Sequence, residues 1–363
     1  MLQPGIELAV EQINQREDLL AGYSVNLTVA NSACNLKLHT IINFVTTFFY
    51  SGVKFAGIVG PLCSDAVKLI SPITRQEGVS LLNFHAGSSL QFTDRNRYRY
   101  AFSTVTSTKP FIELFLHLMK VNEWESVAVL YEQQTTVYLN AYDSLVEKLP
   151  HVYPEGKILF SAPVSEESLP LSSIIHQHLR VVILITTPNI AHKILCLIQR
   201  RYPELTFPSY QFILFGDYLG YYRPVSLTLN NHHYKCSAAE IGRVMDRFLL
   251  TGLKLDVANS TELVSGVTYA ENFQEYEERA NGSATLPANA LYDGVWSLAL
   301  ALNNSIPRLN EIGLDMVDYT YGHREATDII RDEVLKLHFQ ELLDIYHSVK
   351  TPGSLLPLFL LNR

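Results

Sequence analysis

Tryptophan, methionine and cysteine are scarce in this 363-residue sequence, with 2, 4 and 4 residues, and charged residues make up only 18%. No run of consecutive Lys and Arg is longer than two residues, and the net charge is −8. The sequence thus lacks the basic patch that a nucleic-acid partner requires, and we expect none. Apolar runs such as Val181–Ile185 are too short to cross a bilayer. No basic segment followed by an apolar one precedes Gln3, so we expect neither a membrane span nor a signal peptide in this sequence.

Motifs of common enzymes and cofactor sites are also missing. The sequence contains no GxGxxG after a strand, no GxxxxGK[ST], no HExxH and no GxSxG. The cysteines Cys34, Cys63, Cys196 and Cys236 form no CxxC spacing, which argues against zinc. We therefore expect a protein that is not an enzyme, with no catalytic residues, no metal and no cofactor.

The cysteines and four Asn-x-Ser/Thr sequons bear on the compartment. The sequons place candidate glycosylation sites at Asn26, Asn259, Asn281 and Asn303. An even number of cysteines together with sequons favours the secretory route. The alternative is a cytosolic protein with four buried free thiols, and the residues alone leave both interpretations open.

Short apolar strands alternate with amphipathic helices along much of the chain. Strands predicted at 55–59 and 181–185 are followed by helices predicted at 64–76 and 189–201. This alternation is typical of βαβ units in a parallel sheet. It restarts after Thr104, which predicts two doubly wound α/β lobes in tandem.

The rest of the chain gives weaker patterns. Residues 25–29 are rich in strand-forming residues, and 218–238 are predicted to form a long loop. Helices are predicted at 238–250, 289–303 and 325–345, with few strands between them. We expect these helices to complete the earlier sheets rather than to form a third domain.

Two strand-to-helix turns offer hydroxyl groups and glycine. Gly60-Pro61-Leu62-Cys63-Ser64 follows one predicted strand, and Gly87-Ser88-Ser89 follows the next. Ligands of parallel sheets bind beyond the carboxyl ends of the strands, where N–H groups at helix starts suit a carboxylate or a phosphate. The alternative is that Ser64 and Ser88 merely cap helices. The residues do not decide between these two interpretations.

Segments with a family resemblance are spread in order over residues 4–337. They are Ala9-Val10-Glu11-Gln12-Ile13-Asn14, Gly60-Pro61-Leu62-Cys63-Ser64, Gly87-Ser88-Ser89, Arg95-Asn96-Arg97-Tyr98, Ala191-His192-Lys193-Ile194-Leu195-Cys196 and Tyr292-Asp293-Gly294-Val295-Trp296. Together they resemble the ligand-binding ectodomain of class C G-protein-coupled receptors. The sequence is most similar to the ectodomain of metabotropic GABA-B receptors.

The resemblance implies a fold. It is an α/β fold like that of type I periplasmic-binding proteins, with two doubly wound parallel-sheet lobes around a ligand cleft. We expect lobe 1 at 1–106 and 258–340, with its N-terminal strand missing, lobe 2 at 107–257, and a divergent tail at 341–363. Disulfides of the family join neighbouring cysteines, which implies the pairs Cys34–Cys63 and Cys196–Cys236.

The resemblance also implies a binding site for a small amino-acid-like or carboxylate ligand. The positions that match ligand-contacting segments of the family are Ser64, Gly87, Ser88, Ser89, Thr187, Asp217 and Tyr218. The serine hydroxyls of Ser64 and Ser88 would hold the ligand carboxylate.

Several family ligand contacts are replaced. Val105 stands where the family has a histidine of lobe 1, and Pro287 stands where it has a glutamate that meets the ligand amine. Thr187 and Asp217 replace a tyrosine and a tryptophan of lobe 2. We therefore expect a carboxylate ligand and a weak or absent response to GABA.

A receptor of this kind sits on the extracellular face of the plasma membrane. The resemblance implies a homo- or heterodimer formed through lobe 1, and a G protein reached only through a seven-helix domain absent from this sequence. We expect a truncated chain, because a signal peptide and seven helices are missing. The alternatives are a free-standing solute-binding or decoy protein of the same fold, or a partner subunit that binds no ligand.

Overall fold

The computed structural model describes most of the chain and divides it into two compact units. The described residues are 3–29, 45–46, 48–49, 55–61, 63–83, 92, 94–104, 108–165, 167–205, 208–218, 227–229, 234–246, 248–255, 259–281, 286–318, 320–337 and 345–350. One unit comprises Met1–Thr106 and Leu255–Asp344, and the other comprises Ser107–Lys254 and Ile345–Arg363.

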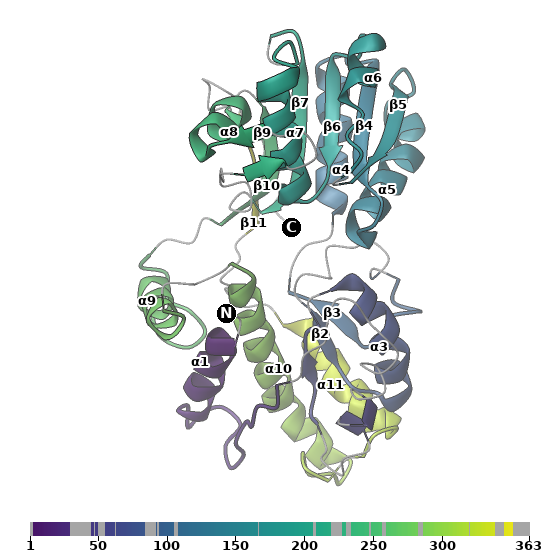
Figure 1. Ribbon diagram of the computed structural model, residues 1–363. Helices are drawn as coiled ribbons and strands as arrows, with labels where there is room; N and C mark the ends of the chain where they lie inside the picture. The colour runs from purple at the N-terminus through teal and green to yellow at the C-terminus, as the bar shows by residue number, and fades with distance from the viewer. Residues whose placement is uncertain are drawn as a thin grey trace. The chain divides into compact units, whose positions relative to one another are not determined.

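The second unit is built on a six-stranded sheet with the strand order β11-β10-β7-β6-β4-β5. Its strands are β4 (Ser126–Glu132), β5 (Lys157–Val164), β6 (Val181–Ile185), β7 (Gln211–Tyr218), β10 (Leu249–Leu255) and β11 (Ile345–Lys350). The pairs from β10 through to β5 are all parallel. The chain passes from β4 to β5 on one side and then returns to β6 on the other, so the winding reverses between β4 and β6 (Figure 1).

Helices cover both faces of this sheet. They are α4 (Lys109–Val121), α5 (Thr136–Val152), α6 (Leu171–His176), α7 (Pro188–Arg201) and α8 (Ala238–Met245). Neighbouring residues of a strand point to opposite faces. Leu214 of β7 shares a core with Ile194 of α7, whereas Phe215 stacks edge-on against Phe111 of α4, with ring centroids 5.2 Å apart. The unit is therefore doubly wound, with α4 and α7 on opposite faces (Figure 1).

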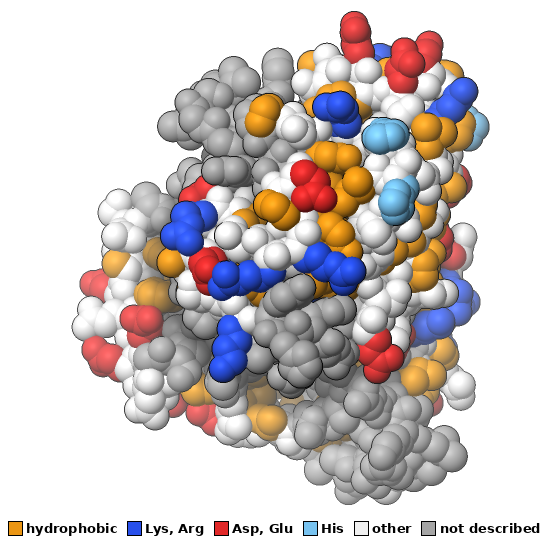
Figure 2. All heavy atoms as spheres, turned by 45° about the horizontal axis from the view of Figure 1, so that its top comes forward, with side chains coloured by type: hydrophobic (Ala, Val, Ile, Leu, Met, Phe, Trp, Pro, Cys, Tyr) orange, Lys and Arg blue, Asp and Glu red, His pale blue; other side chains and the backbone are white. Residues whose placement is uncertain are grey.

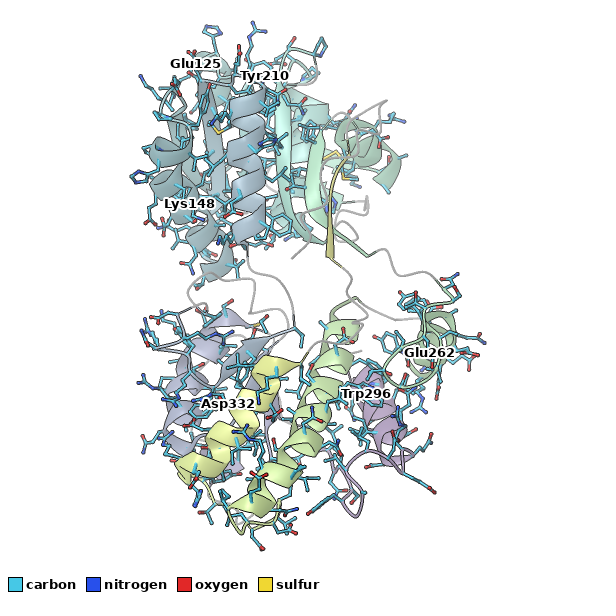
Figure 3. The ribbon with its side chains drawn as sticks, turned by 180° about the vertical axis from the view of Figure 1, so that it is seen from behind. Glu125, Lys148, Tyr210, Glu262, Trp296 and Asp332 are labelled. Atoms are coloured by element: carbon cyan, nitrogen blue, oxygen red, sulfur yellow. A yellow bond between two sulfur atoms is a disulfide. The ribbon has the colours of Figure 1, made fainter. Side chains whose placement is uncertain are left out.

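The first unit carries a smaller parallel sheet with the strand order β1-β2-β3. Its elements are α1 (Gln3–Asn14), β1 (Ile58–Val59), α3 (Ser64–Glu77), β2 (Leu81–Asn83), β3 (Ala101–Ser103), α9 (Tyr269–Arg279), α10 (Leu286–Glu311) and α11 (Arg324–Lys336). Leu8 and Ile13 of α1 share one core with Trp296 of α10 and Ile330 of α11. Trp296 is labelled in Figure 3. The N-terminal third of the sequence and residues 255–344 thus build this unit together.

Glycine lets α10 approach this sheet closely. A Cβ atom on Gly294 would lie 2.9 Å from Cγ1 of Val59, and the hydroxyl of Thr104 donates to the carbonyl of Ala290 at 2.9 Å. These contacts fix α10 across the strand ends of the first unit.

The α/β architecture agrees with the sequence-based prediction, but several local predictions are wrong. The segment predicted as a loop at 218–238 contains a two-stranded antiparallel sheet of β8 (Leu227–Leu229) and β9 (Tyr234–Cys236). The helix predicted at 238–250 ends at Met245, and β10 follows it. Residues 25–29, all of which the structure describes, form no strand.

The last third also differs in its helix ends. The helix predicted to end at residue 303 continues to Glu311, and the helix predicted at 325–345 ends at Lys336. The strand β11 follows in the segment expected to be a divergent tail. Pairing with β10 places this strand at the edge of the second sheet.

Candidate ligand-binding site

Ser64 is the first residue of α3 in the first unit. The residue that caps this helix is Cys63, whose backbone is extended and whose side chain makes no capping hydrogen bond. Ser64 is buried, with 8% of its surface exposed. The first intrahelical hydrogen bond comes from Val67, whose N–H donates to the carbonyl of Cys63 at 3.1 Å. Ser64 therefore lies in the first turn, where N–H groups lack helical acceptors, and does not act as the cap.

The strands of the first unit end side by side at this place. The N–H of Gly60, directly after β1, donates to the carbonyl of Leu82 in β2 at 2.7 Å, and the N–H of Thr104, after β3, donates to the carbonyl of Asn83 at 3.1 Å. The segment after β2 carries Gly87, Ser88 and Ser89, which lie outside the described residues, as does Val105. The structure thus places Ser64 and the strand that leads to Ser88 at one edge.

Thr187 caps the start of α7 in the second unit. Its backbone is extended and its side chain makes no capping hydrogen bond. Its N–H donates to Oε2 of Glu132, the last residue of β4, at 2.9 Å. Oε1 of Glu132 accepts a hydrogen bond of 2.7 Å from the hydroxyl of Thr135, the cap of α5. Glu132 was not predicted as a site residue, although an acid directly after a buried apolar strand is a visible signal.

Asp217 and Tyr218 are the last two residues of β7. Their side chains lie outside the described part of the structure, as does that of Pro287. Because β7 runs parallel to β6, its end lies at the same edge of the sheet as Thr187. The backbone therefore brings these three site positions to the carboxyl edge of the second sheet.

A disulfide joins Cys196 of α7 to Cys236 of β9, with the Cα atoms 5.8 Å apart, as the resemblance implies. It ties the β8–β9 pair to the helix that starts at Thr187. Cys63 is also disulfide-bonded. Cys34, its expected partner, lies outside the described residues.

The four sequons fall in two different settings. Asn26, Asn259 and Asn281 are exposed. Asn303 lies inside α10, where its side-chain oxygen accepts a 2.9 Å hydrogen bond from the N–H of Leu20, and Ser305 of the same sequon is fully buried. A glycan acceptor normally lies in a surface loop. The structure therefore argues against the expected glycan at Asn303.

Within the residues that the structure describes, no helix has both the length and the apolar character of a membrane span. The same residues include no group of three or more His, Cys, Asp or Glu placed to hold a metal ion. On the face drawn in Figure 2, acidic and basic side chains are interspersed among hydrophobic ones.

The sequence is similar to receptors of known name. It is 24% identical over 338 residues to the gamma-aminobutyric acid type B receptor subunit 1 of Mus musculus. This alignment covers 90% of this chain and 33% of that protein. It is 24% identical over 323 residues to subunit 2 of Homo sapiens, which covers 85% of this chain and 32% of that protein. The chain spans about a third of the length of these relatives.

A shorter part of the chain is similar to a receptor-type guanylate cyclase of Caenorhabditis elegans. It has 27% identity over 142 residues, or 38% of this chain and 12% of that protein. A family model described as "Receptor family ligand binding region" matches residues 1–342. The parallel sheets with flanking helices agree with this match. The chain therefore belongs to the family of receptor ligand-binding regions.

Proposed function

We propose that this chain is the extracellular ligand-binding region of a GABA-B-like G-protein-coupled receptor. It binds a small carboxylate or amino-acid-like ligand and acts on a G protein through a seven-helix domain outside this sequence. The first compact unit corresponds to lobe 1 and the second to lobe 2. The family match across residues 1–342 supports the receptor class.

The observation that carries the ligand proposal is the setting of Ser64. Ser64 is a buried residue in the first turn of α3, at the carboxyl edge of a parallel sheet. In this position the N–H groups of the helix start and the hydroxyl together suit an anion. Asp65, the next residue, is exposed and carries the same negative charge as an anionic ligand, so the site favours a single carboxylate over a more highly charged anion.

Alanine substitution of Ser64 tests this proposal. Wild type and Ser64→Ala are compared by calorimetry in a screen of amino acids and small organic acids. A hydrogen bond to a charged group contributes about 1.5–3 kcal/mol, so affinity for every carboxylate ligand should fall about 10- to 150-fold.

Ser71 supplies the matched control in the same helix. Ser71 is also buried, but its hydroxyl donates to the carbonyl of Val67 at 2.6 Å, two turns away from the helix start. Ser71→Ala should bind every hit as wild type does. Carboxylate binding that survives Ser64→Ala would contradict the carboxylate site.

A ligand-free partner subunit is the second candidate. The chain is equally identical, at 24%, to a subunit 1 and to a subunit 2 of the type B receptor. We infer that it pairs with a second chain through lobe 1, as a homodimer or a heterodimer. A folded protein without any hit in the screen, and which co-purifies with a second receptor subunit, would favour this candidate over a ligand-binding subunit or a free-standing solute-binding protein.

A further inference from the structure

Glu132 lies where the winding of the second sheet reverses. β4 ends at Glu132 and its neighbour β6 ends two residues before Thr187, and the chain leaves β4 and β6 in opposite directions across the sheet. Ligands of doubly wound sheets bind in the crevice outside the strand ends at this reversal. Glu132 thus lies at the position of the second unit that is best placed for a ligand.

The carboxylate of Glu132 takes the place that an anion would occupy. One oxygen accepts from the Thr135 hydroxyl at 2.7 Å and the other from the Thr187 N–H at 2.9 Å, so it is held between the starts of α5 and α7. Helix starts attract negative charge. Because this chain fills the position with its own carboxylate, a ligand anion would meet like charge there.

The carboxylate also has acceptor capacity left. An ionised carboxylate offers about four lone-pair sites, and each oxygen of Glu132 accepts one of the two hydrogen bonds described above. Glu132 is only partly buried. A donor that carries positive charge could therefore still reach it.

Thr108 gives a second sign that this edge receives a ligand. It is fully buried at the start of α4, and its hydroxyl has no hydrogen-bond partner. Phe111, one helical turn after Thr108, packs on Phe215 of β7. Thr108 therefore lies one turn closer than Phe111 to the edge of the sheet at which β7 ends. A buried hydroxyl without a partner is a group that a bound molecule can satisfy.

We propose that Glu132 is the residue of the second unit that binds the cationic group of the ligand, which makes the ligand class an amino acid or amine rather than a plain organic acid. This inference rests on the proposed ligand-binding function.

The test compares ligands with and without an amine on isosteric variants of the whole chain. GABA, glycine and L-glutamate are the amine probes, and succinate and glutarate are the probes without an amine. Glu132→Gln should weaken amine probes about 10- to 150-fold and leave the binding of succinate and glutarate within about twofold, because it removes the negative charge at almost the same side-chain volume. Thr108→Val should weaken both groups of probes alike.

Glu125 is the matched control. It is exposed and directly precedes β4, at the opposite end of the same strand from Glu132 (Figure 3). Glu125→Gln makes the same change in net charge, so it corrects for long-range electrostatics and should bind all probes as wild type does. The thermal unfolding midpoint of each ligand-free variant shows whether it is folded.

Four outcomes overturn the inference. Amine probes that bind Glu132→Gln as tightly as wild type exclude the contact. An equal loss for both groups of probes makes Glu132 a positioning residue for Thr187. An amine-selective loss in Asp217→Asn but not in Glu132→Gln moves the contact to Asp217. Failure of every probe to bind folded wild type would refute the proposed function itself, and the inference with it.

Discussion

Side chains that begin helices in this protein fall into two groups at the scale of single residues. Ser237 and Thr268 cap α8 and α9 with complete capping boxes, in which each hydroxyl accepts from a glutamate N–H and the glutamate carboxylate accepts in return. Cys63 and Thr187 cap α3 and α7 without any such bond from their side chains. The Thr187 hydroxyl therefore does not stabilise the start of its helix as those of Ser237 and Thr268 do.

Alanine substitutions should separate these two groups. Loss of a capping hydroxyl typically costs about 0.5–2 kcal/mol, so Thr268→Ala should lower the free energy of unfolding by that amount in urea titrations. Thr187→Ala should change it by less than about 0.5 kcal/mol, as is usual away from such features. A larger loss for Thr187→Ala than for Thr268→Ala would mean that Thr187 has a structural role.

The capping box also has a pH dependence of known sign. Hydrogen bonds from Thr268 lower the pKa of the Glu271 carboxyl below its usual value. A carboxyl with a depressed pKa in the folded state stabilises the protein at neutral pH, and this contribution is lost as the pH falls through that pKa. The free energy of unfolding should therefore lose this contribution only at acidic pH.

His192 should make the second unit sensitive to mild acid. It is buried in α7, its Nε2 has no partner, and burial lowers the pKa of its imidazole below 6.5. The unfolded chain therefore takes up a proton more readily than the folded one, and stability is lost as the pH falls below about 6.5. Urea titrations at pH 7.5 and 5.5 should show a smaller loss in His192→Gln than in wild type.

His117 serves as the control for this measurement, because it is an exposed histidine on α4. His117→Gln should lose as much stability as wild type between the two pH values. An unchanged loss in His192→Gln would show that His192 does not contribute to the acid sensitivity.

Site residues could be predicted from sequence only where they follow a clear strand. Ser64 follows the apolar strand at Ile58–Val59 and precedes a regular amphipathic helix, so its position was predictable. Glu132 follows an equally clear strand, but nothing in the sequence says which helix starts will surround it. That depends on the order of β4, β5 and β6 in the sheet, which no local pattern encodes.

At the scale of elements, tertiary pairing decided what local pattern could not. The apolar spacing after Ala238 continues through Leu250, which predicted one long helix, but β10 pairs with β7 from Leu249 onward. The hydroxyl of Thr251 donates to the carbonyl of Leu214 at 2.9 Å and adds to this pairing. Sheet pairing overrides weak helix propensity because it buries the same side chains with more partners.

The Cys196–Cys236 disulfide should contribute strongly to stability. It closes a loop with a sequence separation of 40 residues, for which loop entropy gives about 4 kcal/mol. Cys236→Ser should lower the free energy of unfolding by about that amount in urea. The double variant Cys196→Ser, Cys236→Ser should be no less stable than either single variant, and additive losses would show that each cysteine acts by packing alone.

At the scale of the whole molecule, the two units differ in how the chain builds them. The second unit is almost continuous in sequence, whereas the first joins Met1–Thr106 to Leu255–Asp344, two segments about 150 residues apart in the sequence. A fragment of residues 107–255 should therefore fold alone, with its five parallel strands and its disulfide. A fragment of residues 1–106 should not, because α1 lacks the core that α10 and α11 provide.

Circular dichroism with heating tests both fragments. We expect a cooperative transition for 107–255 and a gradual, non-cooperative change for 1–106. Cooperative unfolding of 1–106 together with a non-cooperative change in 107–255 would contradict this assignment of the cores.

The joint core of α1 and α10 also constrains events on the ribosome. Leu8 and Ile13 of α1 are buried against α10, which begins at Leu286. At a synthesis rate of about 5–20 residues per second, roughly 15–55 s pass between the synthesis of α1 and that of α10. During this time the continuous second unit can already form. Nascent chains should therefore expose the apolar stripe of α1 to chaperones until translation passes α10, and a pause in translation just before α10 should lengthen that exposure.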